Sequence, residues 1–134
     1  MTAYGAVLLY GALMMVLTLS YAFPRVPLAL LGKRQLDSWE RDKVNPDSAI
    51  FQRMKHAHLN MTESFPVFAS VIVIAGLLDN LPAVTSLAPW VLYLRVGQVV
   101  AHISGTGVAS IGVRATCFVG QVLIIGIMIF QILS

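Results

Sequence analysis

The sequence predicts an all-α membrane protein built as one bundle of four transmembrane helices. Of its 134 residues, 57% are hydrophobic and only 11% are charged, against roughly 25% charged residues in soluble domains. Apolar stretches close to the ~20 residues that a helix needs to cross a bilayer recur along the chain. The polar segments between them leave no room for a separate soluble domain, so we expect one integral-membrane domain over residues 1–134.

The predicted spans cover about residues 3–23, 49–78, 84–104 and 114–133. The first contains no charged residue and ends near Pro24 and Pro27, because proline interrupts helices. The second is longer than a bilayer requires, so its first turns are expected to project into the headgroups. A tight reversal at residues 79–82 leads to the third span, and a Gly/Ser/Thr-rich connection at residues 104–113 leads to the fourth.

Residues 32–49 form the one extended hydrophilic segment and are expected to be the main aqueous loop. Basic residues gather around it, whereas the second loop has none and the third has Arg114. The positive-inside rule then places the first and third loops in the cytoplasm and both termini outside. Trp39 is expected either to anchor this loop at the interface or to cover the mouth of a site. The bases do not form a patterned nucleic-acid surface, so we expect no nucleic-acid partner.

Polar residues at helical spacing mark the second and third spans. The second span carries a stripe at spacings of three, four and three: Arg53, His56, Asn60 and Glu63. The third carries its own stripe at spacings of three and four: Arg95, Gln98 and His102. Because the tight reversal makes these spans antiparallel, residues at equal depth have equal sums of residue numbers. The pairs with equal sums are Glu63 with Arg95, Asn60 with Gln98, and His56 with His102.

This match in depth predicts an ion pair between Glu63 and Arg95, since an isolated charge inside the bilayer costs roughly 2.5–3.5 kcal/mol on insertion scales. Such a pair either fixes the register of the two helices or forms part of a polar cleft for a ligand. Arg53 also has the alternative of reaching the headgroups with its long side chain. His56 and His58 lie about 200° apart around a helix and cannot share an ion, so no metal site is expected. No Ser or Cys shares a helix face with a His and an acid, which argues against a nucleophilic triad.

Residues 51–68 read FQRMKHAHLNMTESFPVF, with Arg53, Asn60 and Glu63 followed by Phe-Pro-Val-Phe. This segment resembles the signature of the MAPEG superfamily, E-R-x-x-R-A-x-x-N-x-x-E with a following F-P-x-F. MAPEG proteins are membrane-associated proteins of eicosanoid and glutathione metabolism. Val-Ala-His at 100–102 and Arg-Ala at 114–115 extend the resemblance over most of the chain.

The resemblance implies a homotrimer of four-helix subunits, with glutathione bound between neighbouring subunits from the cytoplasmic side and an apolar co-substrate entering from the lipid. It assigns glutathione binding to the matching residues and to the polar residues aligned with them: Arg53, His56, Asn60, Glu63, Gln98 and His102. In catalytic members, an arginine on the third helix is thought to stabilise the glutathione thiolate, since a nearby cation lowers the pKa of a thiol. Arg95 is the candidate for that role.

Some positions depart from the family pattern. They are His56 in place of the second arginine, Ser64 in place of an aromatic residue, Val99 in place of the third-helix arginine and Thr106 in place of a tyrosine. Arg95 lies one turn from Val99 on the same face, about 6 Å deeper in the bilayer.

The leading hypothesis is a glutathione-dependent transferase or peroxidase acting on lipophilic electrophiles. The departures keep open a non-catalytic family member that binds lipid or a partner protein in the same cleft. A third hypothesis is a small transporter or proton relay that uses Glu63, Arg95 and the histidines, because charges inside a membrane often mark transport paths.

Overall fold

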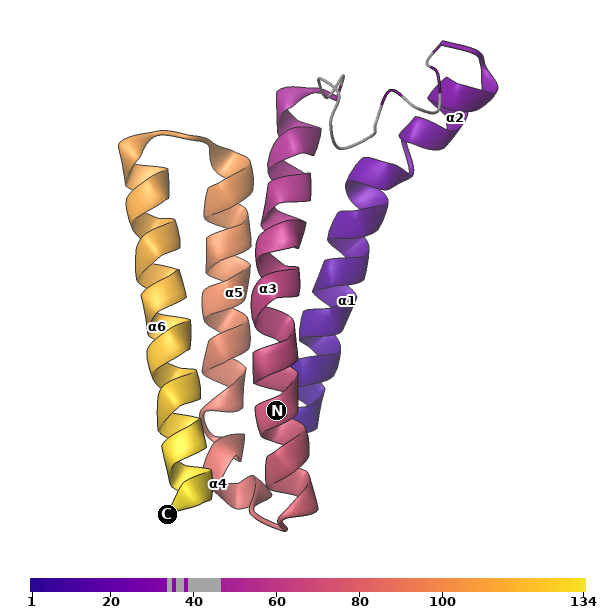
Figure 1. Cartoon of the computed structure of the whole chain (residues 1–134). Helices are drawn as coiled ribbons and strands as arrows, with labels where there is room; N and C mark the ends of the chain where they lie inside the picture. Colours follow the sequence, from indigo (N-terminus) through magenta and orange to yellow (C-terminus); the bar gives the residue numbers. More distant parts are fainter. Residues whose placement is uncertain (34, 36–37, 39–46) are drawn as a thin grey trace.

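The computed structural model describes residues 1–33, 35, 38 and 47–134, and within these residues its regular elements are all helices. They are α1 (Ala3–Ala22), α2 (Arg25–Leu30), α3 (Ala49–Leu77), α4 (Leu81–Thr85), α5 (Ala88–Ser104) and α6 (Val108–Leu133). The long helices α1, α3, α5 and α6 stand side by side and alternate in direction, so both termini lie at the end opposite α2 (Figure 1). Because α1 contacts α5 as well as α3, the arrangement is a bundle and not a single row.

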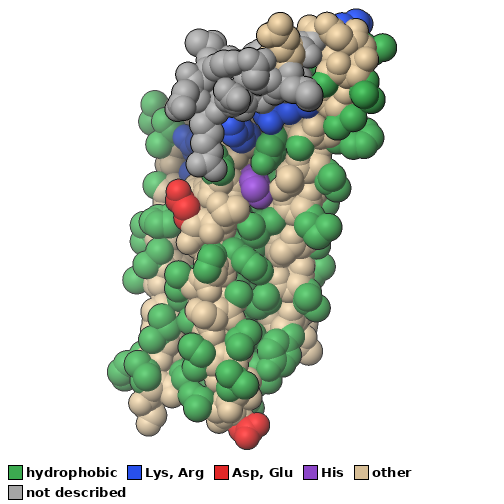
Figure 2. Space-filling view, turned by 45° about the vertical axis from the view of Figure 1, so that its right-hand side comes forward, with side chains coloured by type: hydrophobic (Ala, Val, Ile, Leu, Met, Phe, Trp, Pro, Cys, Tyr) green, Lys and Arg blue, Asp and Glu red, His purple; other side chains and the backbone are tan. Residues whose placement is uncertain are grey.

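The helices form four segments that are long and apolar enough to cross a membrane: Ala3–Leu30, Ala49–Leu77, Leu81–Ser104 and Val108–Leu133. Hydrophobic side chains cover the sides of the molecule, and the basic side chains gather toward the α2 end (Figure 2). The exposed hydrophobic residues include Leu8 at 74% and Leu123 at 62% exposure. This surface suits lipid and not water, which agrees with the predicted multi-pass membrane protein.

Local sequence accounts for the boundaries of the first span. The Thr2 side chain caps α1 by accepting a 3.0 Å hydrogen bond from the Gly5 backbone N–H, as N-cap residues do. The helix ends at Ala22, close to the predicted residue 23, and the short α2 follows Pro24. Gly32 then ends α2 with a left-handed φ of 64°, a conformation that glycine adopts without steric cost.

The third span differs from the predicted helix over 84–104. It begins three residues earlier and is divided into α4 and α5, with a break at residues 86–87. Pro82 and Pro89 lie in the first turns of α4 and α5, where the missing N–H is tolerated. Pro89 has no N–H to bond to the carbonyl one turn earlier, so the two helices cannot join with regular hydrogen bonding.

The fourth span begins at Val108 and not at the predicted residue 114. The predicted connection over 104–113 therefore shortens to residues 105–107. The Ser110 hydroxyl explains part of this, because it donates to the carbonyl of Ala101 and to that of Gly105, the latter at 2.9 Å. These bonds close the α5–α6 turn and let α6 start within it.

The predicted reversal over 79–82 is shorter in the structure, since α4 already begins at Leu81, and the turn carries a strained residue. Asp79 has a φ of 53°, and the N–H of Asn80 donates to the carbonyl of Ala75 at 2.8 Å. This is the bonding pattern that closes helices with a left-handed residue, usually glycine. Most of the predicted aqueous loop, including Trp39, lies outside the described residues.

Candidate functional site

A shallow polar pocket of about 410 Å³ lies among α3, α5 and α6, near the α5–α6 turn. This volume falls in the range of roughly 300–1,000 Å³ that is typical of small-molecule sites. The lining residues are Asn60, Glu63, Gln98, His102, Ile111, Arg114, Ala115 and Phe118. Four of the residues predicted for ligand binding, those at positions 60, 63, 98 and 102, are therefore brought together.

Glu63 lies midway along α3, about 21 Å from either helix end at about 1.5 Å per residue. Its side chain is exposed, and it forms no ion pair within the described residues. A carboxylate at this depth requires a partner, because lipid provides none. Arg114 lines the same pocket and supplies the opposite charge.

Gln98 is oriented by a second glutamine. Gln121 of α6 donates through Nε2 to Gln98 Oε1 at 3.1 Å and to the Cys117 carbonyl at 3.0 Å. Gln98 is 4% and Gln121 2% exposed, so these bonds hold the Gln98 amide in one orientation. Because its oxygen is already bonded, the Gln98 NH₂ group is the part that remains for the pocket.

His102 lines the pocket and also carries a buried polar atom that is unsatisfied. Its Nδ1 is buried and has no hydrogen-bond partner within the described part of the chain. A buried polar atom without a partner is costly.

Two further predicted ligands lie outside the lining. Arg53 donates through Nε to the Ile103 carbonyl at 2.9 Å, which ties α3 to the last turn of α5. His56 is exposed one turn from Asn60 on α3, toward the α2 end of the molecule. Both residues are near the pocket in depth, but neither lines it.

Arg95 is buried inside the bundle, with 1% of its surface exposed. Its Nη2 donates to the Ser64 hydroxyl, and its guanidinium carbon lies 5.4 Å from the centroid of the Tyr10 ring. The Tyr10 hydroxyl is also 2.9 Å from Ser64 Oγ. Arg95, Ser64 and Tyr10 thus form one buried cluster that joins α5, α3 and α1.

The predicted ion pair between Glu63 and Arg95 is wrong. Arg95 bonds to Ser64, the neighbour of Glu63, and the carboxylate faces the polar pocket. Successive helical residues point about 100° apart, so equal depth did not ensure that the two charges face each other. The proton relay through this pair loses its geometric basis.

An apolar groove of about 450 Å³ adjoins the polar pocket and runs between α3 and α6. The two cavities share Asn60, Glu63 and Phe118. The rest of the groove is lined by small or apolar residues and one hydroxyl: Ser64, Val67, Val122, Ile125, Gly126 and Ile129. A polar compartment therefore leads directly into an apolar one at the level of Glu63.

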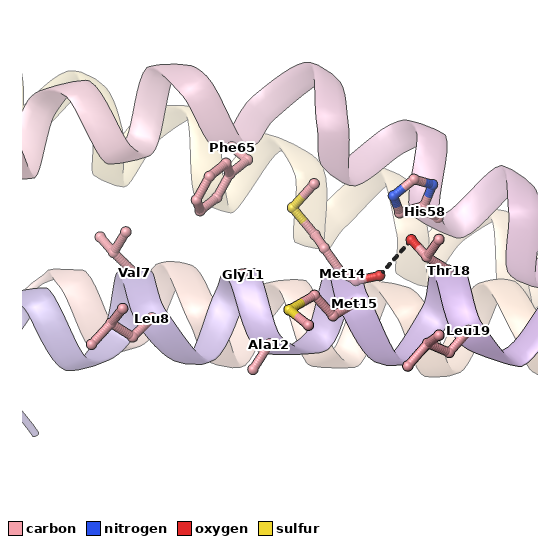
Figure 3. A pocket seen from close by; sticks show the side chains of 10 residues that line it. All are labelled: Val7, Leu8, Gly11, Ala12, Met14, Met15, Thr18, Leu19, His58 and Phe65. Atoms are coloured by element: carbon pink, nitrogen blue, oxygen red, sulfur yellow. Dashed lines mark hydrogen bonds between the residues drawn. The ribbon is translucent and has the colours of Figure 1, made fainter.

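A separate groove of about 720 Å³ lies between α1 and α3. Figure 3 shows Phe65 and His58 of α3 on one side and residues of α1, including Val7 and Thr18, on the other. His58 Nδ1 is 3.1 Å from the Tyr21 hydroxyl. Apart from His58 and Thr18 the lining is apolar, which suits contact with lipid chains or another helix.

The sequence reasoning did not identify Arg114 and Gln121 as site residues. They are seven positions apart on α6, two turns along one face, and this third polar stripe was the available signal. Tyr10 and Ser64 were also missed, because a single hydroxyl in an apolar span carries no pattern.

A model of the MAPEG family matches residues 2–134, which is nearly the whole chain. Comparisons with curated proteins and with solved structures found no match.

Proposed function

Because the chain belongs to the MAPEG family, we propose that it is a glutathione-dependent transferase or peroxidase that acts on lipophilic electrophiles within the membrane. Family membership supports a membrane protein of eicosanoid and glutathione metabolism. The observation that carries the more specific proposal is the junction of the polar pocket with the apolar groove at Asn60, Glu63 and Phe118. Such a junction suits one hydrophilic and one lipophilic reactant.

The polar pocket, together with Arg53 and His56 beside it, offers the groups that glutathione requires. Glutathione carries two carboxylates, one ammonium group, two peptide groups and a thiol. Glu63 attracts the ammonium group, while Arg114 and the terminal nitrogens of Arg53 pair with carboxylates. The amides of Asn60 and Gln98 hydrogen-bond to the peptide groups. His56 and His102 complete the proposed binding set.

Bound glutathione supplies the nucleophile, its thiolate sulfur, so the protein needs no nucleophile of its own. A cation near the sulfur favours the thiolate. We assign this role to Arg95, acting from behind Ser64, and to Arg114 from within the pocket.

The resemblance implies a homotrimer, and the position of Glu63 supports a neighbouring subunit against this face. Glu63 is exposed halfway along a membrane-spanning helix, and a carboxylate in contact with lipid is unfavourable by roughly 2.5–3.5 kcal/mol or more. A neighbouring subunit placed against α3 and α6 would cover the pocket and close the site. Light scattering should give a protein mass for the protein–detergent complex that corresponds to three chains.

Calorimetry with glutathione tests the proposal. Wild-type protein in several detergents and in lipid nanodiscs should bind glutathione, and Glu63→Gln and Asn60→Ala should each weaken binding about tenfold or more, since hydrogen bonds to charged groups contribute about 1.5–3 kcal/mol. Thr62→Ala is the matched control, because Thr62 lies on the same helix turn but its hydroxyl bonds to the Leu59 carbonyl at 2.6 Å. No binding by the wild-type protein under any of these conditions would exclude the proposed function.

A non-catalytic role in binding lipid or a partner protein is the second candidate. The burial of Arg95 favours it, because this cation lines neither the pocket nor the groove. Titration of the bound thiol distinguishes the two. Glutathione held as thiolate at neutral pH supports the enzyme, whereas glutathione held as thiol with a raised pKa supports the non-catalytic role.

A further inference from the structure

Ser64 is the one hydroxyl among the residues that line the α3–α6 groove, and a buried cation lies directly behind it. Asn60 and Glu63 mark the polar end of the groove, and beyond Ser64 the lining is apolar. An occupant that matches this lining has a long apolar body and one hydrogen-bond acceptor near its polar end.

The hydrogen bonds of Ser64 leave its own proton available. Arg95 donates to Ser64 Oγ, and the Tyr10 hydroxyl at 2.9 Å can donate to the same oxygen. Both lone pairs of the serine oxygen are then filled. With Tyr10 as the donor of their shared bond, the acceptors within reach of the serine O–H in the described residues are the carbonyls of Asn60 and Met61, at 3.2 and 3.4 Å. These distances are long for an O–H···O bond. A better acceptor in the groove would take this proton.

The charge of Arg95 determines which acceptor is favoured. No carboxylate pairs with Arg95 within the described residues, so its field in the low-dielectric interior is not cancelled by a counter-ion. A hydroxyl that accepts from a cation is a stronger donor, because hydrogen bonds in a chain polarise one another. The arrangement favours an oxygen that becomes negative during a reaction, as oxyanion-stabilising donors do.

We propose that the Ser64 hydroxyl binds the carbonyl oxygen of a lipophilic α,β-unsaturated carbonyl compound in this groove, with Arg95 as a positioning residue that polarises Ser64. This inference rests on the proposed function and specifies its electrophile. Addition of the glutathione thiolate forms a carbon–sulfur bond at the β-carbon and moves the carbon–carbon π pair toward the carbonyl. The resulting enolate oxygen is held by Ser64, and water returns to the α-carbon the proton that the thiol lost to solvent.

Infrared spectroscopy of a long-chain saturated ketone tests the binding step without glutathione. The carbonyl stretch of the bound ketone should lie at lower wavenumber in wild-type protein than in empty detergent micelles. It should return to the micelle value in Ser64→Ala and shift down again in Ser64→Thr. Thr62→Ala, which alters a hydroxyl outside the groove, should behave as wild type. A wild-type stretch equal to the micelle value overturns the proposal even if a variant does not fold.

Kinetics with two electrophiles test the reaction step. Ser64→Ala should lower kcat/KM about 10²-fold for a long-chain enone but less than twofold for a benzyl halide of similar size, which develops no carbonyl charge. Ser64→Thr should restore the enone rate. Arg95→Met should reduce the rates with both electrophiles, because Arg95 is also assigned to the thiolate, but it should reduce the enone rate by the larger factor. Equal losses for both electrophiles, or no loss for either, would refute a carbonyl-specific role for Ser64.

These measurements separate the inference from the proposed function. Wild-type protein that conjugates the halide, while Ser64→Ala leaves the enone rate unchanged, supports the proposed function and overturns the inference. Wild-type protein that conjugates neither electrophile overturns the transferase activity, and with it the reaction step.

Discussion

The buried cluster of Arg95 with Ser64 and Tyr10 makes a quantitative prediction about which residue is the partner of the membrane-embedded arginine. A double-mutant cycle between Arg95→Met and Ser64→Ala should give a coupling free energy of about 1.5–3 kcal/mol. This is the contribution expected for a hydrogen bond to a charged group, and Arg95 donates such a bond to Ser64 while only 1% exposed. The matched cycle between Arg95→Met and Glu63→Gln should give less than about 0.5 kcal/mol, the level of independent sites.

The cycle is needed because the single variants mix several effects. Arg95→Met also removes the cation–π contact at 5.4 Å with Tyr10, which contributes about 2 kcal/mol when desolvated. It also removes a buried charge whose insertion is unfavourable by roughly 2.5–3.5 kcal/mol. These contributions oppose each other, and they cancel in the coupling term because they occur in both arms of the cycle.

Reversible unfolding in mixed detergent micelles, followed by circular dichroism, provides the free energies of unfolding for each cycle. The reasoning is refuted if Glu63 and Arg95 couple by more than about 1 kcal/mol while Ser64 and Arg95 do not couple. That outcome would restore the ion pair that the sequence pattern predicted.

Further substitutions test the pocket, the α3–α4 turn and the α3–α5 contact. Arg114→Gln should weaken glutathione binding about 10- to 100-fold in calorimetry, because a charge-assisted hydrogen bond contributes about 1.5–3 kcal/mol to the binding free energy. Lys55→Gln removes a charge outside the pocket and should change the affinity less than twofold. Asp79→Gly should raise the free energy of unfolding by about 1 kcal/mol, because glycine adopts a φ of 53° without the steric penalty that a side chain has there. Asp79→Ala keeps this penalty, so an equal rise in the free energy of unfolding for Asp79→Ala would contradict the explanation. Arg53→Met should lower the free energy of unfolding by about 1 kcal/mol or more through loss of the bond to the Ile103 carbonyl, and an unchanged midpoint of detergent unfolding would count against that bond.

The gathering of Asn60, Gln98 and His102 could be predicted from the sequence. A tight turn at residues 79–82 makes α3 and α5 antiparallel neighbours, so position along the chain sets depth in the bundle. Helical spacing then places the members of each stripe on one face. These two constraints predict that the three side chains lie at matched depths on facing helices, and all three line the polar pocket.

The partner of Arg95 could not be predicted in the same way. Depth does not determine direction around a helix, and Glu63 and Ser64 point about 100° apart. The interior position of Arg95 depends on Tyr10, which reaches it from a third helix. The apolar sequence of that helix shows neither a lipid-facing nor a protein-facing side.

The start of the fourth span was missed for a local reason. A Gly/Ser/Thr-rich segment is typical of a loop, yet Ser110 donates to two carbonyls at the end of α5 and stabilises an early helical turn. The earlier start places Arg114 about 1.7 turns into α6, where it lines the polar pocket.

An experimental structure of the protein with glutathione tests the central claim most directly. We predict glutathione in the polar pocket, with its ammonium group at Glu63, a carboxylate at Arg114 and its sulfur toward the groove beside Ser64. Glutathione bound in the α1–α3 groove, or a polar pocket without glutathione at a saturating concentration, would contradict the account.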